Sequence, residues 1–174
     1  DGQEGIAHIG ANQSNVPVEM IEAEYPIRIE RYAIEPDTGG PGQFRGGLSL
    51  VRDYRVLAPA AELNVRSDKR AYPPHGLAGG QPGAPSMNVL SEAGANDRVL
   101  PVLLTEPIKV KQGALFHHLL AGAGGYGDPL DRDVEHVLWD VIEGKVSIAH
   151  AAKAYGVVVS SGAAPRVDRS GTDE

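Results

Sequence analysis

The histidines are the residues of this sequence whose chemistry is easiest to test against their spacing. His117 and His118 are adjacent in an apolar, strand-like run, so their side chains must point to opposite faces and cannot hold one metal ion together. We expect one of them to face inward as a satisfied, partly buried histidine, which is commoner than a catalytic one. The other histidines are scattered, without the partner spacing of a zinc site. The sequence therefore predicts no metal site in this chain.

A glycine-rich stretch offers a second possible chemistry. Residues 122–127 read Gly-Ala-Gly-Gly-Tyr-Gly and match the G-x-G-x-x-G pattern of dinucleotide sites. That site needs a helix to begin at once, whereas Asp128-Pro129 intervenes here. No Lys-Ser or Lys-Thr follows, as a P-loop would require. We interpret the stretch as a glycine-rich turn that is structural or lines a cleft, with Gly124 and Gly125 as cleft candidates.

Charged residues flank two Gly/Pro-rich loops, at residues 36–42 and 72–85, where a site for a phosphate or carboxylate could be built. The alternative is that they are strand-edge charges, solvated or paired across a sheet. A polar stretch before the first strand is either a turn network or a site lining. No Ser-His-Asp order or nucleophile elbow is present. The candidates from these regions are Asn12, Asn15, Glu19, Asp37, Arg45, Arg66, Asp68 and His75, beside Arg52, Lys69, Arg70 and the candidate His117.

Most of the chain has the period-2 alternation of half-buried strands. In the first strand the alternation slips near Arg31, which predicts a β-bulge. The loop at 36–42 reads as a tight turn, and the loop at 72–85 is long enough to suggest a functional one. We expect strands within residues 25–35, 48–57, 61–65, 87–90, 98–102, 108–110 and 114–120.

After residue 127 the apolar period becomes that of a helix, with Asp133 as N-cap and Gly144 just beyond the end. A second short helix begins after Ser147 and ends at Gly156, and residues 157–159 could form a last strand. The predicted fold is mainly β, a turn-rich sheet or sandwich with two short C-terminal helices, and α+β overall. We expect a β-rich domain at 1–127, a helical appendage packed on it at 128–159, and a disordered tail at 160–174.

Composition excludes several classes of function. The 174 residues are 41% hydrophobic, which is enough for one core, and they contain no cysteine for disulfides or thiolate metal sites. The net charge of −7 has no basic cluster, which argues against nucleic acid. The apolar stretches are too short to cross a membrane. The chain starts without Met or a signal sequence, so we expect a cytoplasmic protein that is an internal piece of a longer chain or a processed product.

Four blocks of this sequence resemble the hydantoinase B family, which includes 5-oxoprolinase and the alpha-type subunits of acetone and acetophenone carboxylase. The sequence departs mildly from the family pattern at three positions, with Thr38 in place of serine, His75 in place of an aromatic residue, and Ala123 within the glycine run. The likeness extends from about His8 to Val159, in order. The blocks are Asn15–Glu19 with 24–47, Ser67–Arg70 with 73–83, 124–133 with 140–147, and Tyr155–Val158.

This resemblance implies that the chain is the C-terminal portion of a much longer subunit whose metal-binding acids and histidines lie in its N-terminal part. It also implies an actin-like hydantoinase A-type ATPase partner that phosphorylates a lactam carbonyl or an enolate. We therefore expect ATP with Mg²⁺ and a divalent metal to be bound mainly by other chains of a hetero-oligomer. In this scheme the segment shapes the cleft, and its loop arginines, Arg45 first, meet the phosphorylated intermediate.

The expected function is thus that of one segment of an ATP-dependent cyclic-amide hydrolase, of the N-methylhydantoinase, 5-oxoprolinase or lactamase type. A component of an acetone- or acetophenone-type carboxylase is the alternative. A non-catalytic assembly module, which docks the catalytic subunits through its Gly/Pro loops, and a free-standing ligand-binding β domain are further alternatives. The chain alone is expected to be inactive.

Overall fold

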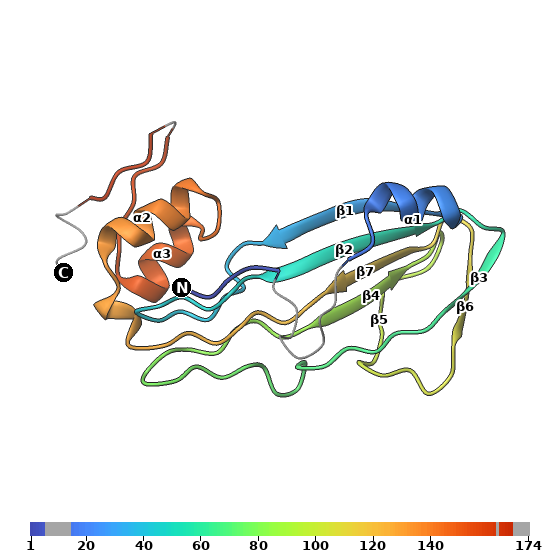
Figure 1. Cartoon of the computed structure of the whole chain (residues 1–174), viewed down its shortest axis with the longest axis horizontal. Helices are drawn as coiled ribbons and strands as arrows, with labels where there is room; N and C mark the ends of the chain where they lie inside the picture. Colours follow the sequence, from blue (N-terminus) through green and yellow to red (C-terminus); the bar gives the residue numbers. More distant parts are fainter. Residues whose placement is uncertain (6–14, 163, 169–174) are drawn as a thin grey trace.

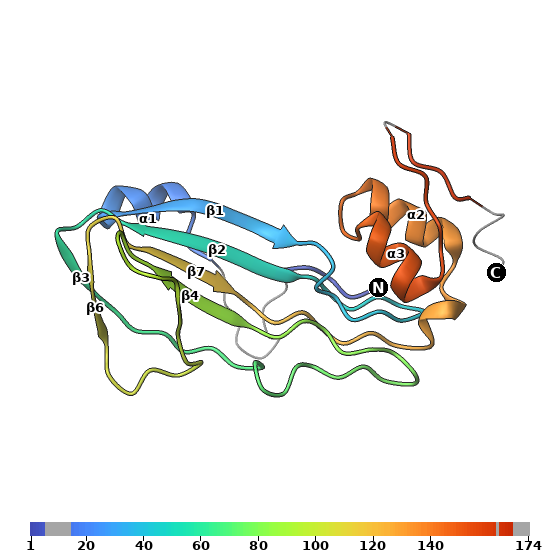
Figure 2. The ribbon, with the colours of Figure 1, turned by 180° about the vertical axis from the view of Figure 1, so that it is seen from behind.

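The computed structural model describes residues 1–5, 15–162 and 164–168. Figure 1 shows an elongated molecule with a β-sheet region at one end, two helices at the other, and long extended segments between them. The view from behind in Figure 2 shows the same three parts in the same order. The predicted class, mainly β with two short helices near the C-terminus, is confirmed.

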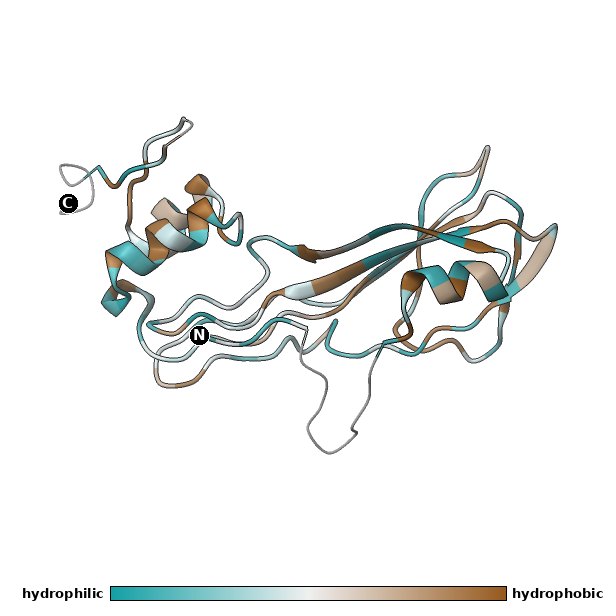
Figure 3. Cartoon of the chain, turned by 45° about the horizontal axis from the view of Figure 1, so that its top comes forward, coloured by the Kyte–Doolittle hydropathy of each residue, from teal (hydrophilic) through white to brown (hydrophobic). Residues whose placement is uncertain are grey.

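The main sheet is antiparallel and has the strand order β1-β2-β7-β4-β5. Figure 3 shows that both apolar and polar residues occur along the strands of this sheet. The predicted slip is also present, because the register between β1 and β2 shifts between Ile29 and Arg31. The bounds of the strands are Ile27–Glu35 for β1, Ser49–Val56 for β2, Met87–Ser91 for β4, Arg98–Val99 for β5 and Leu115–Leu119 for β7.

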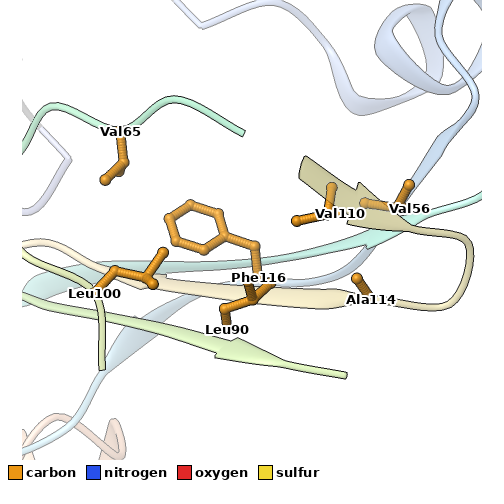
Figure 4. Close-up of a cluster of buried hydrophobic side chains, with 7 residues drawn as sticks. All are labelled: Val56, Val65, Leu90, Leu100, Val110, Ala114 and Phe116. Atoms are coloured by element: carbon orange, nitrogen blue, oxygen red, sulfur yellow. The ribbon is translucent and has the colours of Figure 1, made fainter. Parts of the chain in front are cut away.

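A second, two-stranded sheet covers part of one face of the main sheet. It consists of β3, Ala60–Leu63, and β6, Ile108–Lys111, which pair antiparallel. Apolar side chains of the two sheets meet in one core, shown in Figure 4. Burial of these aliphatic and aromatic groups is the main stabilising contribution to this end of the molecule. The buried members are Val56, Val65, Leu90, Leu100, Val110, Ala114 and Phe116.

A short helix, α1 at Val18–Glu24, precedes β1 and was not predicted. It has no buried residue, and Pro17 at its N-cap position makes no side-chain capping bond. The sequence therefore lacks the two signals that would reveal a helix here. The helix is tied to the sheet instead, because a carboxylate oxygen of Glu22 accepts from the backbone N–H of Ile29 at 2.7 Å.

The Gly/Pro-rich segments form a structure that we call the glycine bundle, made of residues 38–47, 74–84 and 122–127. The predicted tight loop at 36–42 begins with a turn at Pro36 and Asp37, and the segment then runs alongside the other two. Its members exchange backbone hydrogen bonds, such as Gly40 N–H to Ala123 O at 2.8 Å and Gly125 N–H to Gln81 O at 2.9 Å. The bundle forms the long middle part of the molecule in Figure 1.

The C-terminal helices have a core of their own. Helix α2 is Val134–Ile142 and α3 is Ile148–Tyr155. The predicted N-caps are confirmed, because Asp133 accepts from Glu135 N–H and Ser147 accepts from His150 N–H. The helices lie beyond the end of the glycine bundle and not on the sheet (Figure 1). A one-turn 3-10 helix, η2 at Pro129–Asp131, leads into them, and their core contains Val137, Val146, Ala151, Tyr155, Val157 and Val159.

The last described residues return along the chain. Ser160 N–H donates to Arg166 O, and Asp168 N–H donates to Val158 O, each at 2.8 Å. We expected a disordered tail from residue 160 because the side chains there show no periodic pattern of apolar residues. The two backbone hydrogen bonds do not depend on such a pattern. Residues 163 and 169–174 of that expected tail lie outside the described part of the chain.

Candidate functional site

Four polar side chains form a row across one face of the main sheet, and we take this row as the candidate site. Strand register places Tyr32 opposite Arg52, Arg52 opposite His118, and His118 opposite Asn88. Directly opposite residues on neighbouring strands project to the same face, close enough to interact. We call Tyr32, Arg52, His118 and Asn88 the polar row. The polar row lies beside the apolar core and on the same face of the sheet, because His118 and the core residue Phe116 are alternate residues of β7.

Asn88 is held in one orientation by groups beneath it. Its side chain is fully buried. The hydroxyl of Ser67 donates to the Val102 carbonyl at 3.2 Å, so its oxygen accepts from the Asn88 NH₂ group at 2.8 Å. The same NH₂ group lies 3.4 Å from the Pro101 carbonyl oxygen, which can only accept. Both contacts place the amide nitrogen away from His118 and leave the amide oxygen facing it.

The orientation of Asn88 determines the tautomer of His118. The Asn88 Oδ1 atom lies 2.7 Å from His118 Nδ1. Because Oδ1 can only accept, Nδ1 must carry the proton and donate. In a neutral ring the other nitrogen, Nε2, then carries a lone pair. The ring itself stacks on Phe116, with centroids 5.7 Å apart.

Burial lowers the pKa of His118 below its ordinary value of 6.5, and the neighbouring Arg52 and His117 act in the same direction. Each of these causes disfavours the imidazolium form. At neutral pH the His118 ring is therefore uncharged, and its Nε2 atom is an acceptor.

Arg52 is positioned by two tyrosines. Its guanidinium carbon lies 4.1 Å from the centre of the Tyr32 ring, a cation–π contact. One terminal nitrogen donates to the Tyr54 hydroxyl at 3.3 Å. Asn15, a predicted candidate, joins the same site because its amide donates to the Tyr32 hydroxyl at 2.8 Å. The guanidinium is thus held over one ring, and one of its terminal nitrogens is bonded to the other tyrosine.

His117 lies on the opposite face of the sheet, as the adjacent-residue argument predicts. Its Nδ1 atom is 2.6 Å from Asp53 Oδ1, and Asp53 is its direct cross-strand partner. About a third of the His117 side chain is exposed, at 32%. Because the Asp53 carboxylate accepts from Nδ1, it fixes the tautomer of His117 and leaves Nε2 as the other nitrogen of the ring. The two histidines therefore cannot act on one ligand.

Arg45 is buried in an ionic network and does not line an open surface. Its side chain is 2% exposed. Its Nε donates to Asp140 Oδ2 at 3.1 Å, and its remaining nitrogens contact Gly46 O and Glu4. Arg132 donates to the same Asp140 oxygen at 2.8 Å and to the Asp1 carboxylate. This network joins helix α2 to the glycine bundle, and that is a positioning role.

Gly124 and Gly125 are packed inside the glycine bundle. A Cβ on Gly125 would lie 2.2 Å from the Pro41 carbonyl oxygen, and one on Gly124 would lie 2.2 Å from the His75 carbonyl oxygen. Neither glycine has a positive φ, so they are required for space and not for an unusual backbone conformation. Peptide groups occupy the volume that a bound phosphate would need, which supports the structural interpretation of this motif.

The other predicted candidates are dispersed. Asp37 has φ of 61° and accepts from the Ser147 N–H at 2.7 Å, so it ties the end of β1 to the start of α3. Glu19 lies in the exposed first turn of α1. Asn12 lies outside the described residues. The side chains of Arg66, Asp68 and His75 are exposed, and Asp68 accepts from the backbone N–H of Lys69.

Sequence reasoning missed most of the polar row. Arg52 was noted only as a flanking charge, and Tyr32, Tyr54 and Asn88 were not singled out. The alternation of side-chain direction along a strand does show that residues such as Arg52 and Tyr54 project to the same face. Within the described residues, no group of three or more His, Asp or Glu side chains is placed to hold a metal ion, and no helix is long and apolar enough to cross a membrane.

Comparison with known proteins gives the same family along most of the chain. Residues 1–129 match the family model described as Hydantoinase B/oxoprolinase. A protein of Pseudomonas sp. strain NS671, named as the B component of a D-/L-hydantoinase, is 31% identical over 175 residues, 100% of this chain and 29% of that protein. The beta chain of the caprolactamase of Pseudomonas jessenii is 34% identical over 153 residues, covering 82% of this chain and 25% of the relative.

Two solved structures share the fold. The ATP-dependent caprolactamase from Pseudomonas jessenii superposes with a TM-score of 0.75 and 28% identity, over 90% of this chain and 27% of that one. A nucleotide-free acetone carboxylase gives a TM-score of 0.76 and 23% identity, over 91% of this chain and 25% of the other. The chain thus spans between a quarter and three tenths of the length of these proteins. It belongs to the hydantoinase B/oxoprolinase family.

Proposed function

We propose that this chain is the C-terminal segment of a hydantoinase B-like subunit of an ATP-dependent cyclic-amide hydrolase. The observation that carries the proposal is identity along the whole chain to a protein named as the B component of a hydantoinase. The caprolactamase relatives support it independently, in sequence and in structure, and both names describe opening of a cyclic amide.

The partner in this proposal is a second, hydantoinase A-like subunit that uses ATP with Mg²⁺. The relatives named as B and beta components are consistent with such a hetero-oligomer. In this proposal a divalent metal ion is bound by the rest of the B-like polypeptide, as the family resemblance implies. A cytoplasmic location is part of the same proposal, because the cytoplasm supplies ATP.

The role of this segment is to form a rigid wall beside the reacting centre. The glycine bundle supports this role, because its glycines meet neighbouring backbone atoms at distances where any Cβ would collide. The buried network of Arg45, Arg132 and Asp140 attaches the helical end to that wall. The segment positions other groups, and the reaction chemistry belongs to the complete assembly.

A carboxylase component is the second candidate, favoured by the likeness in fold to acetone carboxylase. At 23% sequence identity, that likeness shows only that the two proteins share a fold. The hydrolase interpretation has the stronger support because the relatives named for cyclic-amide substrates have higher identity.

The decisive experiment is reconstitution of the complete B-type polypeptide with its A-type partner. The assembly is given Mg²⁺-ATP with hydantoin, 5-oxoproline or caprolactam, and separately with acetone and bicarbonate. We expect ATP-dependent ring opening of at least one cyclic amide. Carboxylation of acetone without any ring opening would replace the hydrolase proposal by the carboxylase alternative.

A second experiment addresses the assembly-module alternative. The 174-residue chain alone is incubated with the same substrates, Mg²⁺-ATP and a divalent metal. We expect no turnover, and unaided turnover would contradict both the module alternative and our proposal that other polypeptide segments complete the site. Mass measurement of the purified complex then identifies the accompanying chains.

A further inference from the structure

We propose that Arg52, His118 and Tyr54 bind the oxyanion group, a carboxylate or a phosphate, of a small molecule. This goes beyond the proposed hydrolase function and does not depend on it. The three residues project from two neighbouring strands, β2 and β7, and they share one face of the sheet. No described acidic side chain forms an ion pair with Arg52.

The surroundings of Arg52 differ from those of the arginines that serve the fold. Arg55 pairs with Glu30, with two contacts of 2.9 Å and 2.8 Å, and Arg45 and Arg132 pair with Asp140. Arg52 is half-buried, and its contacts are the Tyr32 ring and the Tyr54 hydroxyl. The N–H donors of an arginine fit the oxygens of a carboxylate or a phosphate. Two aromatic residues therefore orient the N–H donors of Arg52, and no described carboxylate pairs with them.

His118 supplies the second recognition element. Asn88 fixes Nδ1 as the donor, so Nε2 is the atom left to meet a ligand. No hydrogen bond to Nε2 occurs among the described residues. The charged or titratable groups facing this ring are Arg52 and Tyr54 from β2 and Tyr32 beyond them on β1, while the opposing residue of β4 is the neutral Asn88. None of these is negatively charged at neutral pH.

Anion binding at this place must move a proton. An anionic oxygen and the Nε2 lone pair repel each other unless a proton lies between them. An anion beside Arg52 also offsets the positive charge that disfavours the imidazolium. A fully ionised group such as acetate should therefore draw one proton from solvent onto Nε2 and turn that nitrogen into a second donor, whereas a hydrogen phosphate can supply this proton from its own hydroxyl. This coupling separates the proposed site from simple attraction of anions to a surface arginine.

The site is also reachable. Arg52, Tyr54 and His118 are each half-buried, and Tyr32 at the edge is 42% exposed. A shallow hollow lined by Tyr32, Ile34 and Leu50 borders the row. The rival occupant is an acidic side chain from another polypeptide segment, which would satisfy Arg52 permanently and exclude free anions.

The test is calorimetric titration of the complete B-type polypeptide with sodium phosphate and with sodium acetate, at constant ionic strength. Each titration is repeated in two buffers of different ionisation enthalpy, which reports proton uptake. We expect binding of at least one anion, with net proton uptake where that anion is acetate. The anion that binds more tightly identifies the phosphate or the carboxylate source.

Three variants accompany the titration. Arg52→Gln should weaken binding by about tenfold or more, since it removes a charge-assisted fork. His118→Gln keeps a donor for Asn88 and should abolish the proton uptake. Arg55→Gln, on the same strand but paired with Glu30 on the other face, is the matched control and should bind like the parent protein.

Two results would overturn the proposal. One is absence of binding of both anions to the complete polypeptide, which is the outcome expected if an acidic side chain already occupies Arg52. The other is equal binding by the parent protein and Arg52→Gln. If Arg52→Gln does not fold, Arg52→Lys replaces it, because it keeps the charge but loses the fork, and unchanged affinity in that variant would contradict recognition by the fork. None of these readouts uses cyclic-amide turnover, so the two proposals fail independently.

Discussion

Arg45 and Asp140 are 95 positions apart in the sequence, yet Arg45 Nε donates to Asp140 Oδ2 at 3.1 Å, with both side chains at least 96% buried. The same carboxylate also receives Arg132 at 2.8 Å. One acidic side chain on α2 is therefore shared by two buried cations, one from the glycine bundle and one from the segment before the helix, beside their contacts with Glu4 and Asp1. The helical end of the molecule is positioned by this shared carboxylate.

Asp140→Asn should strongly destabilise the protein. The change leaves two buried guanidinium groups without their common anion, and breaking a buried ion pair in this way costs about 3–5 kcal/mol. Chemical denaturation followed by far-ultraviolet circular dichroism measures the effect. Glu143→Gln, an exposed residue at the end of the same helix, is the control and should change stability by less than about 0.5 kcal/mol. Equal stability of the two variants would refute the role given to Asp140.

Gly125→Ala should damage the glycine bundle although it adds only a methyl group. The new Cβ would meet Pro41 O at 2.2 Å and Gly40 O at 2.5 Å, and backbone atoms cannot swing aside as side chains do. We expect a loss at or above the upper end of the ~1–3 kcal/mol typical of overpacking. Ala123→Ser adds one atom at an exposed position of the same segment and should be nearly neutral. Thermal unfolding of both variants gives the comparison.

His118 should make stability fall on acidification. Its folded pKa lies below the unfolded value near 6.5, so the unfolded chain binds more protons between these two values. The stabilisation is complete above pH 6.5 and is lost as pH falls toward the folded pKa. Unfolding free energies at pH 7.5 and 5.5 should therefore differ more in the parent protein than in His118→Gln. His136→Gln, at an exposed position on α2, should keep the parent difference, and an identical pH dependence in all three proteins would contradict the assignment.

Tyr155→Phe should leave the protein as stable as before or make it more stable. The Tyr155 hydroxyl is buried without a hydrogen-bond partner among the described residues, and burial raises its pKa to about 12. Removing an unsatisfied hydroxyl relieves a desolvation penalty of about 1–3 kcal/mol. A clear loss of stability in equilibrium unfolding would show that the hydroxyl has a partner in solution. Spectrophotometric titration of the parent protein should find one tyrosine that ionises well above pH 10.

The sequence predicted the parts of this fold that depend on local patterns. Period-2 alternation located the strands, the slip near Arg31 located the bulge, and Asp133 and Ser147 marked the starts of the last two helices. Helix α1 was not predicted, because none of its seven residues is buried and no side chain caps its N-terminus. The glycine bundle was not predicted, because the sequence does not distinguish glycines needed for close backbone contact from glycines needed for turns.

The candidate site was less accessible to sequence reasoning, for a topological reason. The order β1-β2-β7-β4-β5 brings residues from positions 32, 52, 88 and 118 into one row. Alternation states which side of a strand a residue occupies, but it does not say which strands are neighbours. Arg45 shows the converse problem, because a charge beside a glycine-rich loop looked like a surface anion site until its burial was known.

The separation of the two apolar clusters has a consequence for how the molecule comes apart. The sheet cluster draws only on residues between positions 54 and 116, and the helical cluster only on residues after 133. Hydrogen bonds such as that from Ser147 N–H to Asp37, and the ion pair of Arg45 with Asp140, connect the helical end to the rest of the molecule. Amide protons of α2 and α3 should therefore exchange with solvent in an opening event of lower free energy than that of β2 and β7, and Asp140→Asn should lower it further.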